Sequence, residues 1–365
     1  MTIVAVRTHR LTAPLHTPFV TALRRATTVD TLVVEVVDAD GRSGFGEAPQ
    51  VWQVTGASVA GAEACVRELL GPTLTGRNPD DLTARCAEVR RSVAGNEAAR
   101  CAVDVALHDL AARRLGVPLV RLLGGTRLRV PTDVTVAAGD PAEIAAAARR
   151  RHAEGFGVLK LKVGTDAAGD LDRVRAVRGA VGGGVRIRLD ANQGWTPREA
   201  VRVIRGIEDA GLGVELVEQP VDRRDLDGMA WVSERVQIPI LADESVFDLR
   251  DLVEVIRRRA ADLVNVKLAK CGGLSTARTL LEVAAAYGVG TVVGSMMETQ
   301  VGVGAAASLV AAHPATGTAD LDAAWWLARS PVVGGIRYDA ASIVLPDAPG
   351  LGIASVSEVK IQDKD

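Results

Sequence analysis

The sequence predicts a (β/α) barrel that follows a separate α+β domain. From about residue 130, short β-branched runs alternate with Ala-, Leu- and Arg-rich runs, as is typical of parallel strands joined by helices. Eight such strands fit into about 190 residues, which suits a somewhat compact barrel. The first 125 residues lack this rhythm. An open doubly wound sheet is the competing architecture for the rhythmic part.

The N-terminal region combines a hairpin with long helical runs. The stretch "TLVVEVVDADGRSGFGEAP" predicts two strands that turn at Asp40 and Gly41, and "NEAARCAVDVALHDLAARRLG" predicts a helix. The tail returns to short strand-like pieces such as "ASIVLP", which could pair with the N-terminal sheet. We therefore expect an α+β capping domain at 1–125, a barrel at 126–324 and a C-terminal segment at 325–365.

The barrel elements follow one another with recognisable punctuation. Gly155, Gly211 and Gly288 stand where a helix end needs a left-handed residue. Thr196 suits a helix N-cap, with Glu199 placed for the return bond of a capping box. The expected strands lie near 130–136, 158–163, 185–190, 214–218, 238–242, 262–267, 290–294 and 317–320.

The overall composition excludes several classes of protein. The net charge of −2 gives no field that would attract nucleic acid or an acidic membrane. No run reaches 18 uninterrupted apolar residues, and arginines interrupt the N-terminal stretch, so we expect neither a membrane span nor a signal peptide. The cysteines form no CxxC pair, which favours reduced thiols and a cytoplasmic protein. They are Cys65, Cys86, Cys101 and Cys271.

Charged residues end most of the predicted barrel strands. In a barrel, the carboxyl ends of the strands form the face that carries the chemistry. Three consecutive strands end in Asp190, Glu218 and Asp243. Three carboxylates this close would raise one another's pKa unless a cation lay among them. Oxygen ligands without His or Cys favour a hard divalent ion, so we expect Mg²⁺, with Mn²⁺ as the second choice.

Lysines stand on both sides of these carboxylates. Lys160 and Lys162 share one face of the second strand because side chains alternate along a strand, and Lys267 ends the sixth strand. A metal stabilises the charge that develops when a carboxylate substrate loses its α-proton to form an enediolate. Two lysines on opposite faces can remove and return that proton, which inverts the carbon. We therefore expect Lys162 and Lys267 to be the acid–base pair of a racemase or epimerase, with Lys160 controlling the charge beside them.

These residues resemble the muconate-lactonizing-enzyme branch of the enolase superfamily. The matching motifs cover most of the chain, and they are strong as a set although each is weak alone. They are "GFGEAP" at 44–49, "KLK" at 160–162, "LDAN" at 189–192, "EQP" at 218–220, "ADES" at 242–245 and "NVKLAKCGG" at 265–273. The resemblance implies a modified (β/α)₇β TIM barrel with an N-terminal α+β capping domain that the C-terminal segment completes. It also implies a homo-oligomer, because the family is often oligomeric.

Within this branch the chain resembles the dipeptide epimerases. The "DLD" at 320–322 looks like their Asp-x-Asp pair, which implies that Asp320 and Asp322 bind the α-ammonium of a dipeptide. "TALRRAT" at 21–27 resembles their mobile loop and implies that Arg24 pairs with a glutamate side chain, although Arg25 leaves the register open. The implied function is epimerisation of the C-terminal residue of a dipeptide, L-Ala-D/L-Glu. Further residues at family substrate positions are Thr135, Lys160, Ser295, Met297 and Glu298.

Several alternatives remain open from the sequence. An N-acyl or N-succinyl amino acid racemase, or an o-succinylbenzoate synthase, would use the same centre, but its substrate lacks the ammonium that an Asp-x-Asp pair would bind. A cycloisomerase would share the enediolate and show double-bond chemistry. A Schiff-base lysine aldolase would not need three carboxylates. A binding protein without catalysis would hold a metal or ligand and exchange no proton.

Overall fold

The N-terminal domain is an antiparallel sheet covered by helices. The computed structural model describes residues 2–313 and 317–357 of the chain. The sheet has the order β1-β2-β3, and β2 and β3 pair from Val37 and Ser43 outward, which confirms the predicted turn at Asp40 and Gly41. The elements are β1 (Ile3–Val20), β2 (Arg25–Asp38), β3 (Ser43–Pro49), α1 (Val59–Cys65), the π-helix η1 (Val66–Leu70), α2 (Gly71–Leu74), α3 (Leu82–Ser92), α4 (Glu97–Leu115) and α5 (Leu119–Leu122).

The long helix α4 lies directly against this sheet. A Cβ atom on Gly46 would stand 1.9 Å from the carbonyl oxygen of Ala102, so only glycine permits the approach. Leu32, Val34 and Val36 alternate along β2 toward the same buried cluster as the inner face of α4. The first domain therefore has a core of its own, as the change in sequence texture predicted.

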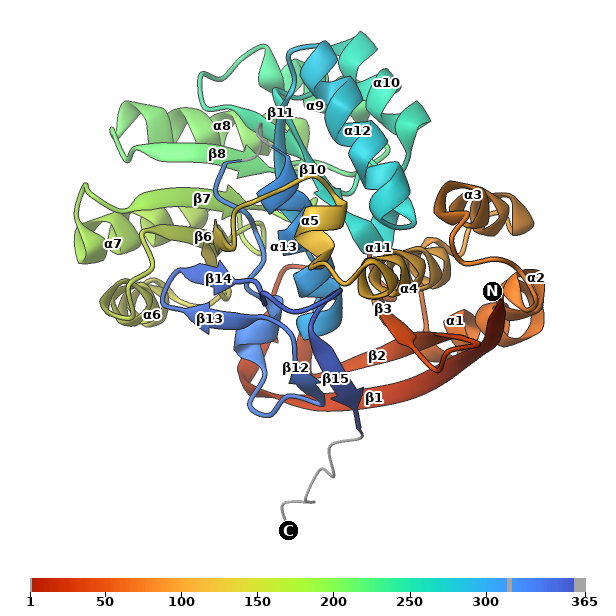
Figure 1. The fold of residues 1–365 in the computed structure, drawn as a ribbon. Helices are drawn as coiled ribbons and strands as arrows, with labels where there is room; N and C mark the ends of the chain where they lie inside the picture. Colours follow the sequence, from red (N-terminus) through yellow and green to blue (C-terminus); the bar gives the residue numbers. More distant parts are fainter. Residues whose placement is uncertain (1, 314–316, 358–365) are drawn as a thin grey trace.

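A parallel sheet forms the second part of the molecule, with helices around its outside (Figure 1). The strand order is β11-β10-β9-β8-β7-β6-β5. The strands are β5 (Val134–Val136), β6 (Val158–Lys162), β7 (Arg186–Asp190), β8 (Val214–Glu218), β9 (Ile240–Ala242), β10 (Leu263–Lys267) and β11 (Gly290–Gly294). The helices are α6 (Pro141–Ala153), α7 (Asp170–Val181), α8 (Pro197–Asp209), α9 (Leu226–Ser233), α10 (Leu249–Arg258), α11 (Leu268–Cys271), α12 (Leu274–Ala286) and α13 (Gln300–Ala312).

The sheet closes through a very short eighth strand. Ala319 bridges Thr132, next to β5, and Asp320 bridges Gly294 at the end of β11. The expected strand at 317–320 is therefore reduced to two bridges. The expected strand at 130–136 is divided into β4 (Arg129–Pro131) and β5, because β4 pairs with the C-terminal segment instead of the barrel. These findings confirm the predicted modified barrel with its capping domain.

The local signals for helix ends are also confirmed. Gly155, Gly211 and Gly288 have φ values of 98°, 62° and 71°, in the left-handed region that favours glycine. Thr196 accepts a hydrogen bond from the backbone N–H of Glu199, whose side chain bonds the Thr196 backbone in return. None of the helices in the described ranges is long and apolar enough to cross a membrane.

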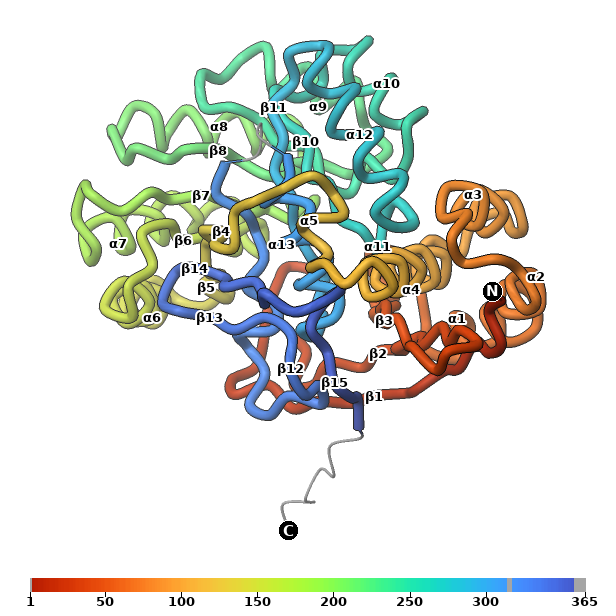
Figure 2. Tube along the Cα trace, viewed as in Figure 1, coloured from red at the N-terminus to blue at the C-terminus, as the bar shows by residue number. Residues whose placement is uncertain are grey.

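The C-terminal segment runs along the junction of the two parts (Figure 2). It contains the 3₁₀-helix η2 (Ala323–Trp326) and the strands β12 (Val332–Gly334), β13 (Arg337–Asp339), β14 (Ser342–Val344) and β15 (Ile353–Val356). Strand β14 pairs with β4, whereas the segment contacts the N-terminal sheet through a bridge between Leu15 and Leu327 and through the rings of η2. Arg113 of α4 donates to the carbonyl oxygen of Ile353 at 2.7 Å. The segment thus contacts the capping domain through α4, the loop after it and strand β1.

Candidate active site

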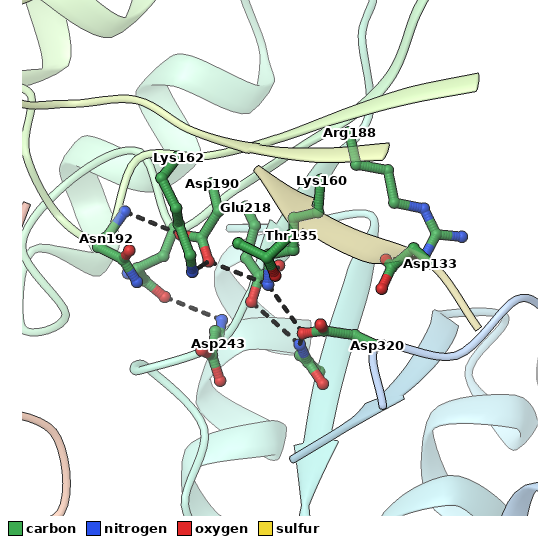
Figure 3. Close-up of polar contacts among 12 residues, drawn as sticks. Asp133, Thr135, Lys160, Lys162, Arg188, Asp190, Asn192, Glu218, Asp243 and Asp320 are labelled. Atoms are coloured by element: carbon green, nitrogen blue, oxygen red, sulfur yellow. Dashed lines mark hydrogen bonds and ion pairs between the residues drawn. The ribbon is translucent and has the colours of Figure 1, made fainter. Parts of the chain in front are cut away.

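The predicted site residues converge at the carboxyl ends of the barrel strands (Figure 3). Most of them line one cavity, to which the tip of the β1–β2 hairpin also contributes, whereas Asp190, Glu218 and Glu298 are not among its lining residues. The strands bring charged side chains inward because the alternation along each strand turns every second residue to the inside. The predicted residues that line the cavity are Arg24, Thr135, Lys160, Lys162, Asp243, Lys267, Ser295, Met297, Asp320 and Asp322.

Lys160 lies among the carboxylates on one side of the site. Its Nζ atom is 3.0 Å from Asp190 Oδ2 and 2.7 Å from Glu218 Oε2. Lys162, two residues further along β6, donates to Asp190 Oδ2 at 2.6 Å. All four side chains are buried, so each charge depends on its partner in place of water. These ion pairs with carboxylates explain how two lysines can lie on the same face of a buried strand.

Lys267 occupies the other side of the same group. Its Nζ atom is 2.6 Å from Asp243 Oδ2 and 3.9 Å from Glu218 Oε1. Lys270, which is fully buried in α11, donates to Asp243 Oδ1 at 2.6 Å. Strands β7, β8 and β9 separate β6 from β10 in the sheet, so the two predicted acid–base lysines flank the three carboxylates.

The carboxylates and lysines shift one another's pKa values. Burial raises the pKa of Glu218 to about 7, and the neighbouring Asp190 charge adds to this. Burial lowers the pKa of Lys267, but the charges of Asp243 and Glu218 outweigh it and hold the pKa above its ordinary range. A neutral lysine base at this position therefore requires a further positive charge to balance the carboxylates. A divalent cation among Asp190, Glu218 and Asp243 would supply that charge.

The Asp-x-Asp pair has two different environments. Asp320 Oδ2 accepts a hydrogen bond from Lys160 Nζ at 2.8 Å. Asp322 Oδ2 accepts from the backbone N–H of Thr135 at 2.7 Å and from the indole N–H of Trp326 at 2.8 Å. Both side chains are buried. Among the described residues, no positively charged side chain pairs with Asp322, so its carboxylate can accept a cation from a ligand.

The hairpin tip contributes one guanidinium to the cavity. Arg24 lines it, whereas Arg25 is exposed and is not among the lining residues. Burial lowers the pKa of Arg24, and no carboxylate of the described residues pairs with it. The sequence left the choice between the two arginines open. The structure places Arg24, and not Arg25, in the lining of the cavity.

Glu298 is buried and hydrogen-bonded to the backbone of its own loop. Its Oε1 atom accepts from the backbone N–H of Met296 at 2.8 Å, and it is not among the residues that line the cavity. Glu47 of β3 lies beside it and accepts hydrogen bonds from Thr299 and Gly302 at the start of α13. Glu298 therefore lies at the junction between the capping domain and the barrel.

The raised pKa of Glu298 predicts that the free energy of unfolding depends on pH. Burial, together with the charge of Glu47, raises its pKa to about 8 from an ordinary 4.5. The folded chain thus favours the protonated acid, and this stabilisation is lost as the pH rises from about 4.5 through about 8. We expect urea unfolding to show a smaller loss of stability between pH 6 and pH 9 for Glu298→Gln than for the unaltered protein.

A carboxylate with the opposite shift provides the control. Glu199, bonded to the Thr196 N-cap, has a lowered pKa, so it is ionised at both pH values. Glu199→Gln should change stability by the same amount at pH 6 and pH 9. An identical pH dependence in Glu298→Gln and the unaltered protein would contradict the assignment.

Three further polar residues belong to the site and were missed in the sequence. Asn265 donates to Glu218 Oε1 at 3.0 Å, and it lies two residues before Lys267 on the same strand face. Asn192 donates to Glu244 Oε1 at 3.2 Å. The remaining oxygens, Asn192 Oδ1 and Glu244 Oε2, are buried and have no hydrogen-bond donor in the structure. These unpartnered acceptors beside three carboxylates fit the oxygen-rich surroundings of a hydrated hard cation.

Another group of potential metal ligands lies in the capping domain. Cys86, Asp104 and His108 bring donor atoms within 4.8 Å of one another. His108 Nδ1 donates to the carbonyl oxygen of Asp104 at 2.8 Å, so this nitrogen carries a proton. The hydroxyl of Ser275 donates to the Asp104 carboxylate at 2.6 Å, next to the start of α12. Contacts within the protein thus account for this group, which joins the capping domain to the barrel.

Charged side chains gathered at the carboxyl ends of parallel barrel strands are typical of a barrel enzyme. Family models cover nearly the whole chain: "Mandelate racemase / muconate lactonizing enzyme, N-terminal domain" matches residues 3–124, and "Enolase C-terminal domain-like" matches residues 143–359. The chain belongs to this family, the mandelate racemase / muconate lactonizing enzymes of the enolase superfamily. The resemblance carried by the strand-end motifs is therefore confirmed.

Individual relatives are similar over their full length. The L-Ala-D/L-Glu epimerase of Bacillus subtilis is 43% identical over 361 residues, covering 99% of each chain. A solved substrate-liganded complex of the L-Ala-D/L-Glu epimerase from Bacillus subtilis superposes with a TM-score of 0.95, covering 98% of this chain and 100% of that one. A dipeptide epimerase from Enterococcus faecalis, solved with Mg and L-Leu-L-Tyr, has a TM-score of 0.94, 37% identity, and coverage of 97% and 100%.

Proposed function

We propose that this protein is a Mg²⁺-dependent dipeptide epimerase that inverts the α-carbon of the C-terminal residue, with L-Ala-D/L-Glu as its substrate. One observation carries the proposal. Among the described residues, no cation pairs with Asp322 and no carboxylate pairs with Arg24, although both line the cavity beside lysines that flank three acidic groups. The similarity to epimerases that act on dipeptides supports it.

The two unpaired charges suit the two ends of an acidic dipeptide. The α-ammonium of the first residue would bind Asp320 and Asp322, and the side-chain carboxylate of the second would bind Arg24. Burying a charge is costly unless an opposite charge lies beside it. Such a substrate would supply the opposite charges for Asp322 and Arg24. Thr135, Ser295 and Met297 line the same cavity and would shape the space between these ends. Glu298 would not contact the substrate in this proposal. It would act indirectly, by holding the loop that carries Met297.

Asp190, Glu218 and Asp243 would hold the cation. The fit rests on an all-oxygen set from three consecutive strands and on the unpartnered oxygens of Asn192 and Glu244 next to it. When bound, Mg²⁺ supplies positive charge where the substrate carboxylate becomes more negative as its α-proton leaves. It also favours the neutral form of the lysine that acts as base.

Lys162 and Lys267 would move the proton. One neutral amine removes the α-proton from its side of the substrate, and the ammonium on the other side returns a proton, which leaves the carbon inverted. Lys160, held by Asp190, Glu218 and Asp320, would remain charged and fix these carboxylates. Lys270 would similarly fix Asp243 from outside the cavity.

Proton NMR in D₂O tests the proposal with L-Ala-L-Glu, the enzyme and Mg²⁺. The expected result is loss of the glutamate α-proton signal together with appearance of the second diastereomer. Exchange without the second diastereomer would keep proton removal and contradict the second lysine. If the protein instead racemises N-succinyl amino acids and leaves free dipeptides untouched, the substrate assignment is wrong.

A further inference from the structure

An aromatic cluster joins the hairpin tip to the Asp-x-Asp segment. His16 and Phe19 come from β1, and Trp325 and Trp326 come from η2. The ring of Trp326 stacks on His16 at a centroid distance of 5.1 Å and meets Phe19 edge-on at 5.5 Å. Phe19 in turn lies 5.9 Å from Lys162 Nζ. The cluster therefore extends from η2, next to Asp322, to Lys162, the proposed acid–base lysine.

Trp326 has a polar contact as well as this packing. Its side chain is buried, and its indole N–H donates to Asp322 Oδ2 at 2.8 Å. The backbone N–H of Thr135 donates to the same oxygen at 2.7 Å. Two donors from different elements on one carboxylate oxygen fix the plane of the group. The side chain of Thr135 also hydrogen-bonds the carboxylate, and among the described residues no cation pairs with it, so it can still accept from the ammonium of a ligand.

The partners of Asp322 differ in kind from those of its neighbour. Asp320 is paired with the charged amine of Lys160 at 2.8 Å. The groups that hydrogen-bond Asp322, the backbone and side chain of Thr135 and the indole N–H of Trp326, are all neutral, so they orient the carboxylate without cancelling its charge. The negative charge of Asp322 therefore remains available to a cation. The indole helps to set the orientation of the carboxylate toward that cation.

We propose that Trp326 is a positioning residue that orients Asp322 toward the ammonium of the substrate and so favours free dipeptides over N-acylated ones. This inference rests on the proposed function. The ring of Trp326 is fixed on one side by Phe19 and His16 of the hairpin, so the orientation of Asp322 depends on the packing of β1 against η2. The effect acts through Asp322 and involves no contact between Trp326 and the reacting carbon.

The variant Trp326→Phe removes the N–H and keeps an aromatic ring. We expect the KM for L-Ala-L-Glu to rise about tenfold with kcat changed less than about twofold, because a poorly oriented Asp322 binds the ammonium more weakly and has no part in the proton transfer. The inhibition constant of N-acetyl-L-Ala-L-Glu, which lacks the ammonium, should stay within about twofold of its value in the unaltered protein. A general loosening of the fold would weaken both ligands together.

Trp325→Phe is the matched control, since it makes the same chemical change one residue away. The Trp325 ring lies against Arg151 at 4.4 Å, and its indole nitrogen has no partner among the described residues. This variant should leave both constants unchanged. A second variant guards against misfolding: benzothienylalanine at position 326 replaces the N–H by sulfur and keeps the ring shape. It should reproduce the rise in KM.

The outcomes separate this inference from the proposed function. An unaltered protein that epimerises no dipeptide overturns the proposed function, and the role of Trp326 falls with it. An active protein whose KM for L-Ala-L-Glu is the same with phenylalanine or benzothienylalanine at position 326 overturns the role of Trp326 alone. Equal weakening of the dipeptide and its N-acetyl form would do so as well.

Discussion

Replacement of Lys267 by alanine is expected to stop interconversion of the two epimers while one epimer still exchanges its α-proton. General acid–base catalysis contributes about 10² to 10⁴ in rate, so epimerisation should fall by roughly 10³ or more. Lys162 remains on the other side of the three carboxylates and can still remove the proton that faces it. Proton NMR in D₂O, started separately from L-Ala-L-Glu and L-Ala-D-Glu, measures the exchange of each epimer.

The structure allows this substitution without leaving a buried charge alone. Asp243 loses Lys267 but keeps Lys270 at 2.6 Å. In the reciprocal variant Lys162→Ala, Asp190 keeps Lys160 at 3.0 Å. Both variants should therefore fold and bind Mg²⁺, which separates loss of the base from loss of the site.

The reciprocal variant is also the matched control. Lys162→Ala should preserve exchange of the epimer that Lys267→Ala blocks, and block the one it preserves. Equal loss of exchange from both epimers in each variant would contradict the assignment of one lysine to each face. It would then leave one of the lysines with an electrostatic part only.

The sequence predicted the centre of the site because its signals are local. Asp190, Glu218, Asp243, Lys162 and Lys267 each end a short apolar strand, and parallel strands bring such ends together whatever the surrounding loops do. The same argument would have found Asn265, because the period of two places it on the face of Lys267. The repeating part of the fold was predictable for the same reason.

Residues whose position depends on distant segments were less accessible. Glu298 follows β11 closely in sequence, but the N–H of Met296 and the proximity of Glu47 determine its orientation. Trp326 contacts Asp322 within one helical turn. It also contacts His16, which lies about 310 residues earlier in the chain, and no sequence periodicity predicts that contact. The division of the strand at 130–136 depends on β14, which lies more than 200 residues later.

Removal of the divalent cation is expected to stop proton exchange at both faces of the substrate. Enolate-like charge without a cation would develop beside Asp190, Glu218 and Asp243, and the metal contribution in such sites is several kcal/mol, or roughly 10³ in rate. Treatment with EDTA should abolish exchange of both epimers, and Mg²⁺ should restore it. This symmetric loss distinguishes the cation from either lysine, whose removal affects one face.

Glu218→Gln tests the same point within the protein. Glu218 comes from the central strand of the three, and its oxygens accept from Lys160 at 2.7 Å and Asn265 at 3.0 Å. Glutamine keeps the shape and removes the negative charge, so we expect Mg²⁺ affinity, measured by calorimetry, to fall by about 100-fold or more, with loss of exchange at both faces. Glu47→Gln makes the same change at a buried carboxylate that faces α13 and should leave Mg²⁺ affinity within about twofold. Exchange that survives EDTA, or unchanged Mg²⁺ affinity in Glu218→Gln, would contradict the metal site. The three carboxylates would then serve to hold the lysines, and those lysines alone would stabilise the charge on the substrate.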